Sequence, residues 1–145
     1  MLGDIYYFLG LLLFLVDLGL LMKYSKIQKT KNWVDAFSKV TKRKPNKDDM
    51  KSEDFQDLNS FNSVLTFDFL WMFFGLITNS WKFFLLLLIV NFLFNILILQ
   101  SKSMKKVIFI LGFLKMCLIT FSIGLLVINH FHLHKDLYEM VLNLI

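Results

Sequence analysis

The sequence is poor in several residues that soluble proteins use freely. Its 145 residues include one cysteine, one proline, one arginine, one alanine and six glycines. The single Cys117 excludes an internal disulfide, and with it the membrane thiol oxidoreductases that need paired cysteines. Residue types with AT-rich codons (Phe, Tyr, Met, Ile, Asn and Lys) are used in their place, which indicates a low-GC bacterium, an organelle or a protist. Because nearly every basic residue is therefore lysine, the scarcity of arginine carries little functional information.

Long apolar runs are what the chain has in abundance. Hydrophobic residues make up 57% of it, against about 45–50% in a soluble domain. A bilayer crossing needs about 20 apolar residues, within a range of about 17–25. Four blocks reach that range, at residues 5–22, 61–77, 83–99 and 107–129. The sequence predicts an all-α integral membrane protein, a single membrane domain over 1–145 with four transmembrane helices.

The basic residues predict how these helices are threaded. Thirteen of the 16 lie in the loops 23–60 and 100–106, whereas only Lys82 and Lys135 lie on the opposite side. Lysine-rich loops stay on the cytoplasmic side of a membrane. We therefore expect both loops inside, in a bacterial inner membrane or an organelle inner membrane with its matrix side, and both termini outside. No basic residue precedes the first block, so we expect that helix to be retained and not cleaved as a signal peptide.

Two amphipathic helices are expected outside the spans. Trp33, Phe37 and Val40 recur at helical spacing in the inner loop, which is typical of a helix on the membrane surface. In the outer tail 130–145, an apolar helical face is formed by Leu133, Leu137, Met140, Val141 and Leu144. Acidic residues interrupt the lysines of the inner loop, so no nucleic-acid partner is expected. The expected partners are the lipid bilayer and other membrane subunits or copies of this chain.

Five polar residues interrupt the apolar blocks. Asp17, Asp68 and Lys115 lie in the first, second and fourth blocks, and Asn91 and Asn95 lie one turn apart in the third. With a rise of about 1.5 Å per residue, all five fall at a similar depth in the bilayer. Ionisable groups at that depth are costly and normally have a protein partner. We expect Lys115 to pair with one aspartate, and the other aspartate to be protonated or bonded to an asparagine.

Glycines share a helix face with the charged residues. Gly10 precedes Asp17 by seven residues, Gly75 follows Asp68 by seven, and Gly112 precedes Lys115 by three. Small residues mark places where membrane helices approach closely. The polar layer is therefore expected to face neighbouring helices and not lipid.

Histidines follow the last apolar block. On an α-helix His130 and His134 would share a face, which is a spacing that can hold zinc or copper. Polar residues at the membrane interface are the simpler interpretation. The sequence has no nucleophile motif, no glycine-rich phosphate loop and no HExxH, so no catalytic residue and no cofactor are predicted.

These features predict a non-enzymatic subunit of a membrane complex or of a homo-oligomer. An accessory subunit of an energy-transducing complex and a bacterial immunity or defence component both fit this description. One alternative is an oligomeric ion channel or pore that uses the polar layer. A second alternative is an outer-face metal-binding protein that uses the histidines.

Overall fold

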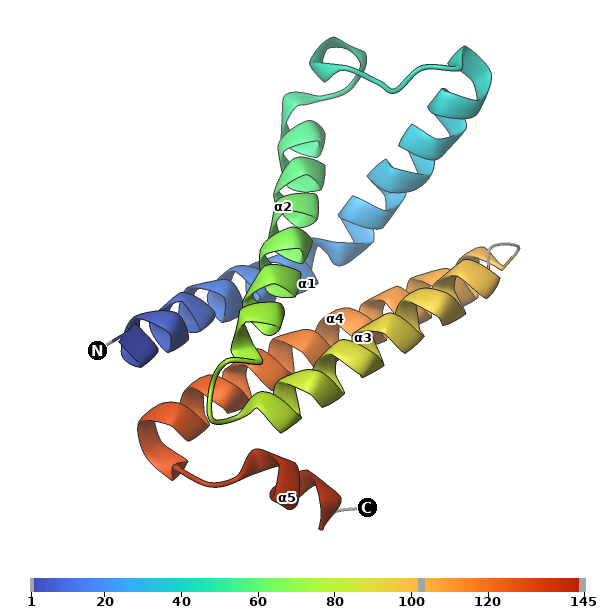
Figure 1. Ribbon diagram of the computed structural model, residues 1–145. Helices are drawn as coiled ribbons and strands as arrows, with labels where there is room; N and C mark the ends of the chain where they lie inside the picture. Colours follow the sequence, from blue (N-terminus) through green and yellow to red (C-terminus); the bar gives the residue numbers. More distant parts are fainter. Residues whose placement is uncertain (1, 102–103, 144–145) are drawn as a thin grey trace.

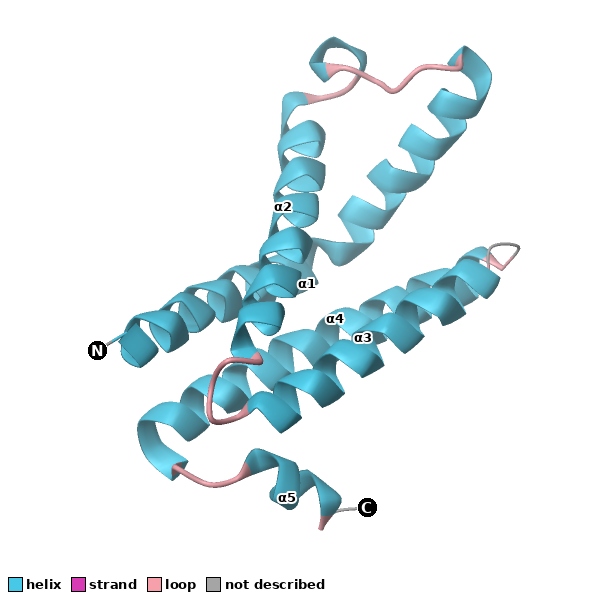
Figure 2. Cartoon of the chain, in the orientation of Figure 1, coloured by secondary structure: helices cyan, strands magenta, loops and turns pink. Residues whose placement is uncertain are grey.

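The computed structural model describes residues 2–101 and 104–143 (Figure 1). The helices are α1 (Leu2–Thr41), α2 (Ser52–Gly75), α3 (Trp81–Gln100), α4 (Lys105–Ile128) and α5 (Leu137–Leu142). A 3₁₀ turn (η1, Lys47–Asp49) precedes α2, and a π-helical turn (η2, Asn129–Leu133) extends α4. Those two ranges contain no strand (Figure 2), which confirms the all-α class.

Three helices are long and apolar enough to cross a membrane: α1, α3, and α4 together with η2. They correspond to the first, third and fourth predicted spans. The exception is α2, whose apolar stretch is interrupted by Asn62, Ser63, Thr66 and Asp68. The chain therefore has the helices of a membrane protein, and the predicted count of four spans exceeds the three that meet this criterion.

The helices pack as two hairpins, α1 with α2 and α3 with α4. The main contact between the two hairpins is that of α1 with α4. In Figure 1, α3 and α4 run antiparallel, and the N-terminal part of α1 lies along α4. Helix α2 packs against α1 and reaches α3 through the short turn at 76–80. The C-terminal part of α1 diverges from α4 (Figure 1). The connecting segment 42–51 joins this part of α1 to the start of α2.

The length of α1 differs from the prediction. The first span was expected to end at residue 22 and to be followed by a separate surface helix, but one helix continues to Thr41, because no proline or β-branched run stops its propagation. It ends where Lys42 adopts a left-handed conformation (φ 55°), and Pro45 follows within the connecting segment. Helix α2 then begins at Ser52, with Glu53 and Asp54 in its first turn. The expected inner loop 23–60 is thus mostly helix.

The predicted surface helix is therefore the last part of α1 and not a separate element. Trp33 and Val40 are 41% and 84% exposed, while Phe37 is half-buried. The rings of Trp33 and Phe37 stack with their centroids 5.2 Å apart. In the described part of the predicted amphipathic tail, residues 130–143, the helical segments are the end of η2 and the short α5, whose Leu137 is buried. Leu144 lies outside the described residues.

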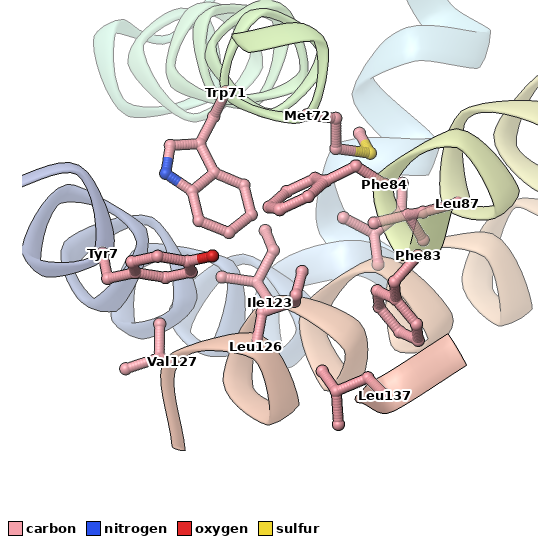
Figure 3. Packing of buried hydrophobic residues seen from close by; sticks show 11 residues of the cluster. Tyr7, Trp71, Met72, Phe83, Phe84, Leu87, Ile123, Leu126, Val127 and Leu137 are labelled. Carbon is pink, nitrogen blue, oxygen red and sulfur yellow. The ribbon is translucent and has the colours of Figure 1, made fainter. Parts of the chain in front are cut away.

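Two groups of buried apolar side chains form the core. The first, here called the histidine-end cluster, receives residues from all five α-helices: Tyr7, Trp71, Met72, Phe83, Phe84, Leu87, Ile119, Ile123, Leu126, Val127 and Leu137. Figure 3 shows Trp71 of α2 and Phe84 of α3 directed toward Ile123 of α4. The second, the basic-end cluster, comes from α1, α2 and α4 alone: Leu20, Tyr24, Ile27, Phe61, Val64 and Met116.

Candidate intramembrane polar site

Asp17 and Asp68 lie in the buried stripes of α1 and α2. The stripe on α1 consists of Tyr7, Gly10, Asp17, Leu20, Tyr24 and Ile27, and that on α2 of Phe61, Val64, Asp68, Trp71, Met72 and Gly75. Spacings of three and four residues keep such a stripe against neighbouring helices. The two aspartates are 0% and 1% exposed, so both carboxylates are enclosed by protein.

Neither carboxylate has a hydrogen-bond partner in the described part of the chain. All four carboxylate oxygens of Asp17 and Asp68 are buried without one, as is the side-chain oxygen of Asn91. A buried polar group without a partner costs about 1–3 kcal/mol, because it loses the hydrogen bonds that water would provide. The centre of the α1–α2 contact is therefore a destabilising feature of the fold.

Lys115 has a different partner from the one predicted. Its Nζ donates a hydrogen bond to Oδ1 of Asn95, at 2.7 Å. Within residues 2–101 and 104–143 it forms no ion pair with Asp17 or Asp68, so the expected pair is wrong. Asp17 does not border the cavity that Lys115 lines, and although Asp68 does, the half-buried Lys115 reaches the exposed Asn95 on α3 instead.

Four of the five predicted polar residues border one cavity. It has a volume of about 300 Å³ between α2, α3 and α4, and Asp68, Asn91, Asn95 and Lys115 all line it. Asp17 is not among its lining residues. The cavity reaches the molecular surface, because its lining residues Asn95 and Phe69 are exposed. The polar layer therefore extends from a closed centre to an edge that other molecules can contact.

The three glycines of the polar stripes lie against aromatic side chains of other helices. A methyl group added at Gly75 would come within 2.3 Å of the Phe84 ring, and one at Gly10 within 2.5 Å of Trp71. At Gly112 it would meet the Tyr24 hydroxyl at 2.0 Å. Sequence reasoning missed Gly124, which faces the ring of Phe14 in the same way. The other three glycines were selected by their spacing along the chain from a charged residue, and Gly124 has no charged residue at such a spacing.

A reciprocal hydrogen-bonded pair joins α1 to α2 near the histidine end. Trp71 Nε1 donates to the backbone oxygen of Tyr6 (3.1 Å), and the Tyr6 hydroxyl donates to the backbone oxygen of Trp71. The two rings stack with centroids 5.0 Å apart and an interplanar angle of 4°. The residues are 65 positions apart, so no periodicity in the sequence could have revealed this contact.

The histidines are not arranged as predicted. Residues 129–133 form a π-helical turn and His134 has a left-handed backbone (φ 50°), so His130 and His134 do not share an α-helical face. His130 stacks on Tyr7 at 4.0 Å, and its Nε2 lies 3.1 Å from Oδ1 of Asp4. Both histidines border a hollow of about 710 Å³. Within the described ranges, no three His, Cys, Asp or Glu side chains are grouped to hold a metal ion.

Ion pairs gather at the opposite end, where α1 meets the start of α2. Nζ of Lys23 and of Lys26 each lie 3.0 Å from a carboxylate oxygen of Asp57. Hydrogen bonds from these lysines hold the pKa of Asp57 below its usual value. In the connecting segment, Arg43 donates two hydrogen bonds to Asp49 (2.6 and 2.8 Å), which lower the pKa of Asp49 to about 2. The one arginine of the chain thus cross-links this segment, together with the backbone N–H of Asn46, which also donates to Asp49.

Comparison with known proteins gives no relative: no family model, no curated protein and no solved structure matches this chain. The functional argument therefore rests on the geometry of the chain itself.

Proposed function

We propose that this protein is a non-enzymatic membrane subunit whose polar cavity edge packs against another transmembrane helix. The observation that carries the proposal is the Lys115–Asn95 pair, which lies at the surface of helices long and apolar enough to span a membrane. A charged side chain facing lipid is costly, so such residues normally face protein or water. Lys115 has further N–H donors, and a helix with a polar acceptor would satisfy them.

The partner helix belongs to another subunit or to a second copy of this chain. An accessory subunit of an energy-transducing complex fits this description, and so does a bacterial immunity or defence component. Neither assignment needs a catalytic group or a cofactor. In both, the chain contributes buried contacts and lipid-facing helices.

We also propose α2 as the fourth span. Its exposed side chains include Phe67, Phe69 and Phe73, which suit contact with lipid. The part of the predicted span that is helical, residues 61–75 of α2, would rise about 22 Å, less than the roughly 30 Å of a hydrocarbon core. A short span is accommodated by local thinning of the bilayer or by partner helices.

In the proposed orientation, the lysine-rich end faces the cytoplasm or matrix. This is supported by a shared hollow at that end, which Lys29 of α1 and Lys105 and Lys106 of α4 line together. Trp33, Phe37 and Val40 would then contact the inner membrane surface. In a Cys117→Ser background and in sealed cells, Lys44→Cys should resist an impermeant thiol reagent, whereas Lys135→Cys should react. Labelling at position 44 and not at position 135 would indicate the opposite orientation.

The subunit proposal is tested by making the cavity edge apolar. The double variant Lys115→Met/Asn95→Leu should separate from the complex in which the wild type is found after mild detergent extraction. Blue-native electrophoresis and mass spectrometry of co-purifying proteins would measure this. The matched control is Phe92→Leu, on a 64%-exposed position of α3 outside the cavity lining, which should leave the complex intact. A wild type that is monomeric and free of partners would overturn the proposal.

An ion or proton path is the second candidate function, favoured by the unpartnered carboxylates of Asp17 and Asp68. Proteins retain destabilising groups of this kind where function needs them. Liposomes that contain the purified protein should then dissipate a pH gradient, and Asp68→Asn should abolish this without loss of folded protein. Equal proton flux in wild type and variant would exclude a path through Asp68.

A further inference from the structure

A groove between α1 and α4 lies at the lysine-rich end of the molecule. Its volume is about 390 Å³. Lys29, Gln28 and Asn32 line it from α1, and Lys105 and Lys106 line it from the first turn of α4. All three lysines are exposed. The groove therefore presents three ammonium groups and two amide side chains from helices that are far apart in sequence.

Among residues 2–101 and 104–143, no carboxylate lines this groove. In the part of the chain that the structure describes, none of its three lysines has a carboxylate oxygen within 4 Å. Lys29 also borders a hollow that contains Asp49 and Asp54. Those two carboxylates already bind Arg43 and Lys26. The positive charge of the groove is therefore not neutralised by the protein, which contrasts with Lys23 and Lys26 on the side of α1 that faces α2.

The groove is apolar on its other side. Phe109 and Ile110 of α4 line it one turn further along the helix, and Ile110 is 54% exposed. If α4 spans the bilayer from Lys105, its first turn would lie at headgroup level and Ile110 at the start of the hydrocarbon. Charge and apolar surface thus follow each other in the order in which a phospholipid presents phosphate and acyl chain.

We propose that this groove is a binding site for an anionic phospholipid, with the phosphate held by Lys29, Lys105 and Lys106 and an acyl chain along Ile110. Basic pockets between membrane helices on the cytoplasmic or matrix side bind anionic headgroups in this way. A zwitterionic lipid satisfies the site less well, because its own ammonium group opposes the uncompensated charge. The site is independent of the Lys115–Asn95 edge and of the partner that covers it.

The experiment compares two triple variants that remove the same charge. Lys29→Gln/Lys105→Gln/Lys106→Gln removes the groove lysines, and Lys39→Gln/Lys42→Gln/Lys44→Gln is the control outside the groove. Binding of dioctanoylphosphatidylglycerol and of dioctanoylphosphatidylcholine to the full chain in mild detergent is measured by microscale thermophoresis. The groove variant should bind phosphatidylglycerol about tenfold to a hundredfold more weakly, and the control should lose less than threefold. Size-exclusion profiles and circular dichroism identify any variant that fails to fold.

Three outcomes would overturn the proposal. Equal losses in the two triple variants would mean that attraction is non-specific, and equal affinity for the two lipids would mean that the anion is not recognised. Inorganic phosphate that binds as tightly as phosphatidylglycerol would mean that the apolar side takes no part. The single variant Ile110→Ser keeps all three lysines and should still weaken phosphatidylglycerol binding. Unchanged binding in this variant would contradict a role for the apolar side of the groove, even if the triple variant fails to fold.

Discussion

The two ends of this molecule are held together by different forces. At the histidine end all five α-helices contribute to one apolar cluster, which the Tyr6–Trp71 pair reinforces. At the basic end the cluster comes from three helices, and ion pairs such as Lys23–Asp57 join α1 to α2. Packing is insensitive to salt and pH, whereas exposed ion pairs depend on both. The histidine end therefore depends mainly on packing, with one ion pair between Asp4 and His130, whereas the basic end depends more on ion pairs.

The largest expected effect tests the packing difference directly. Gly75→Ala should lower the free energy of unfolding by about 1–3 kcal/mol, because the added methyl meets the fully buried ring of Phe84. Gly112→Ala should cost less, since only the far end of the Tyr24 side chain must move. Gly19→Ala, which has nothing within 4 Å, should be neutral or stabilising. Thermal unfolding in detergent measures all three, and equal losses at positions 75 and 112 would contradict the comparison.

Between the two ends, the buried Asp17 and Asp68 should lower the free energy of unfolding. Asp17→Val or Asp68→Val should each raise the free energy of unfolding by about 1 kcal/mol, because each removes unpartnered oxygens from a buried site. Thr66→Val, at an exposed position on α2, is the control and should change little. The same thermal unfolding series provides the measurement. Lower stability in both aspartate variants would contradict the view that these carboxylates destabilise the fold.

At the basic end, removing an acidic partner should have a smaller and salt-dependent effect. Asp57→Asn should lower stability by at most about 1 kcal/mol at low salt, and the difference should shrink in 1 M salt. Because the folded state lowers the pKa of Asp57, its contribution is present above the pKa of the unfolded chain. It is lost as the pH falls through the folded pKa. The control Glu139→Gln, at the histidine end, should have an effect on stability that does not depend on salt. Unfolding scans of both variants at two salt concentrations measure this difference.

The smallest effect is local to the connecting segment. Since the pKa of Asp49 is about 2 in the folded chain and near 4 when unfolded, its ion pair with Arg43 should hold above pH 4. It should weaken between about pH 4 and pH 2. A spin label on Lys44→Cys, in a Cys117→Ser background, should become mobile over that interval while global helicity stays constant. Arg43→Gln should give the mobile spectrum at every pH, and an unchanged spectrum in that variant would exclude the ion pair as the cause of order.

Much of the fold could be predicted because apolar length and periodicity are local properties. Helices α3 and α4 begin and end within a few residues of the blocks 83–99 and 107–129. The continuity of α1 from the first span to Thr41 was missed, because the charged residues after residue 22 were interpreted as a break before a separate surface helix. Lysine and glutamine are good helix formers, so a helix that has already formed can extend through them.

The candidate site could be predicted only in part. Depth alone placed Asp68, Asn91, Asn95 and Lys115 at one level, and the structure brings these four to one cavity. Neither depth nor a shared face gives the distance between side chains, so the predicted partner of Lys115 was wrong. The stacking of His130 on Tyr7 was equally out of reach, because it joins the two ends of the chain.

The sequence by itself determined that this chain is helical, that it has helices apolar enough for a membrane, and where its lysines concentrate. These follow from composition and from the fixed rise of a helix. Only the tertiary structure decided which groups meet. Lys115 contacts Asn95, Lys29 lies beside Lys105 and Lys106, and Asp17 and Asp68 are enclosed without a hydrogen-bond partner among the residues described. The physical reason is that hydrogen bonds and charge interactions act over a few ångströms. The positions of side chains at that scale depend on how the helices rotate and pack against one another.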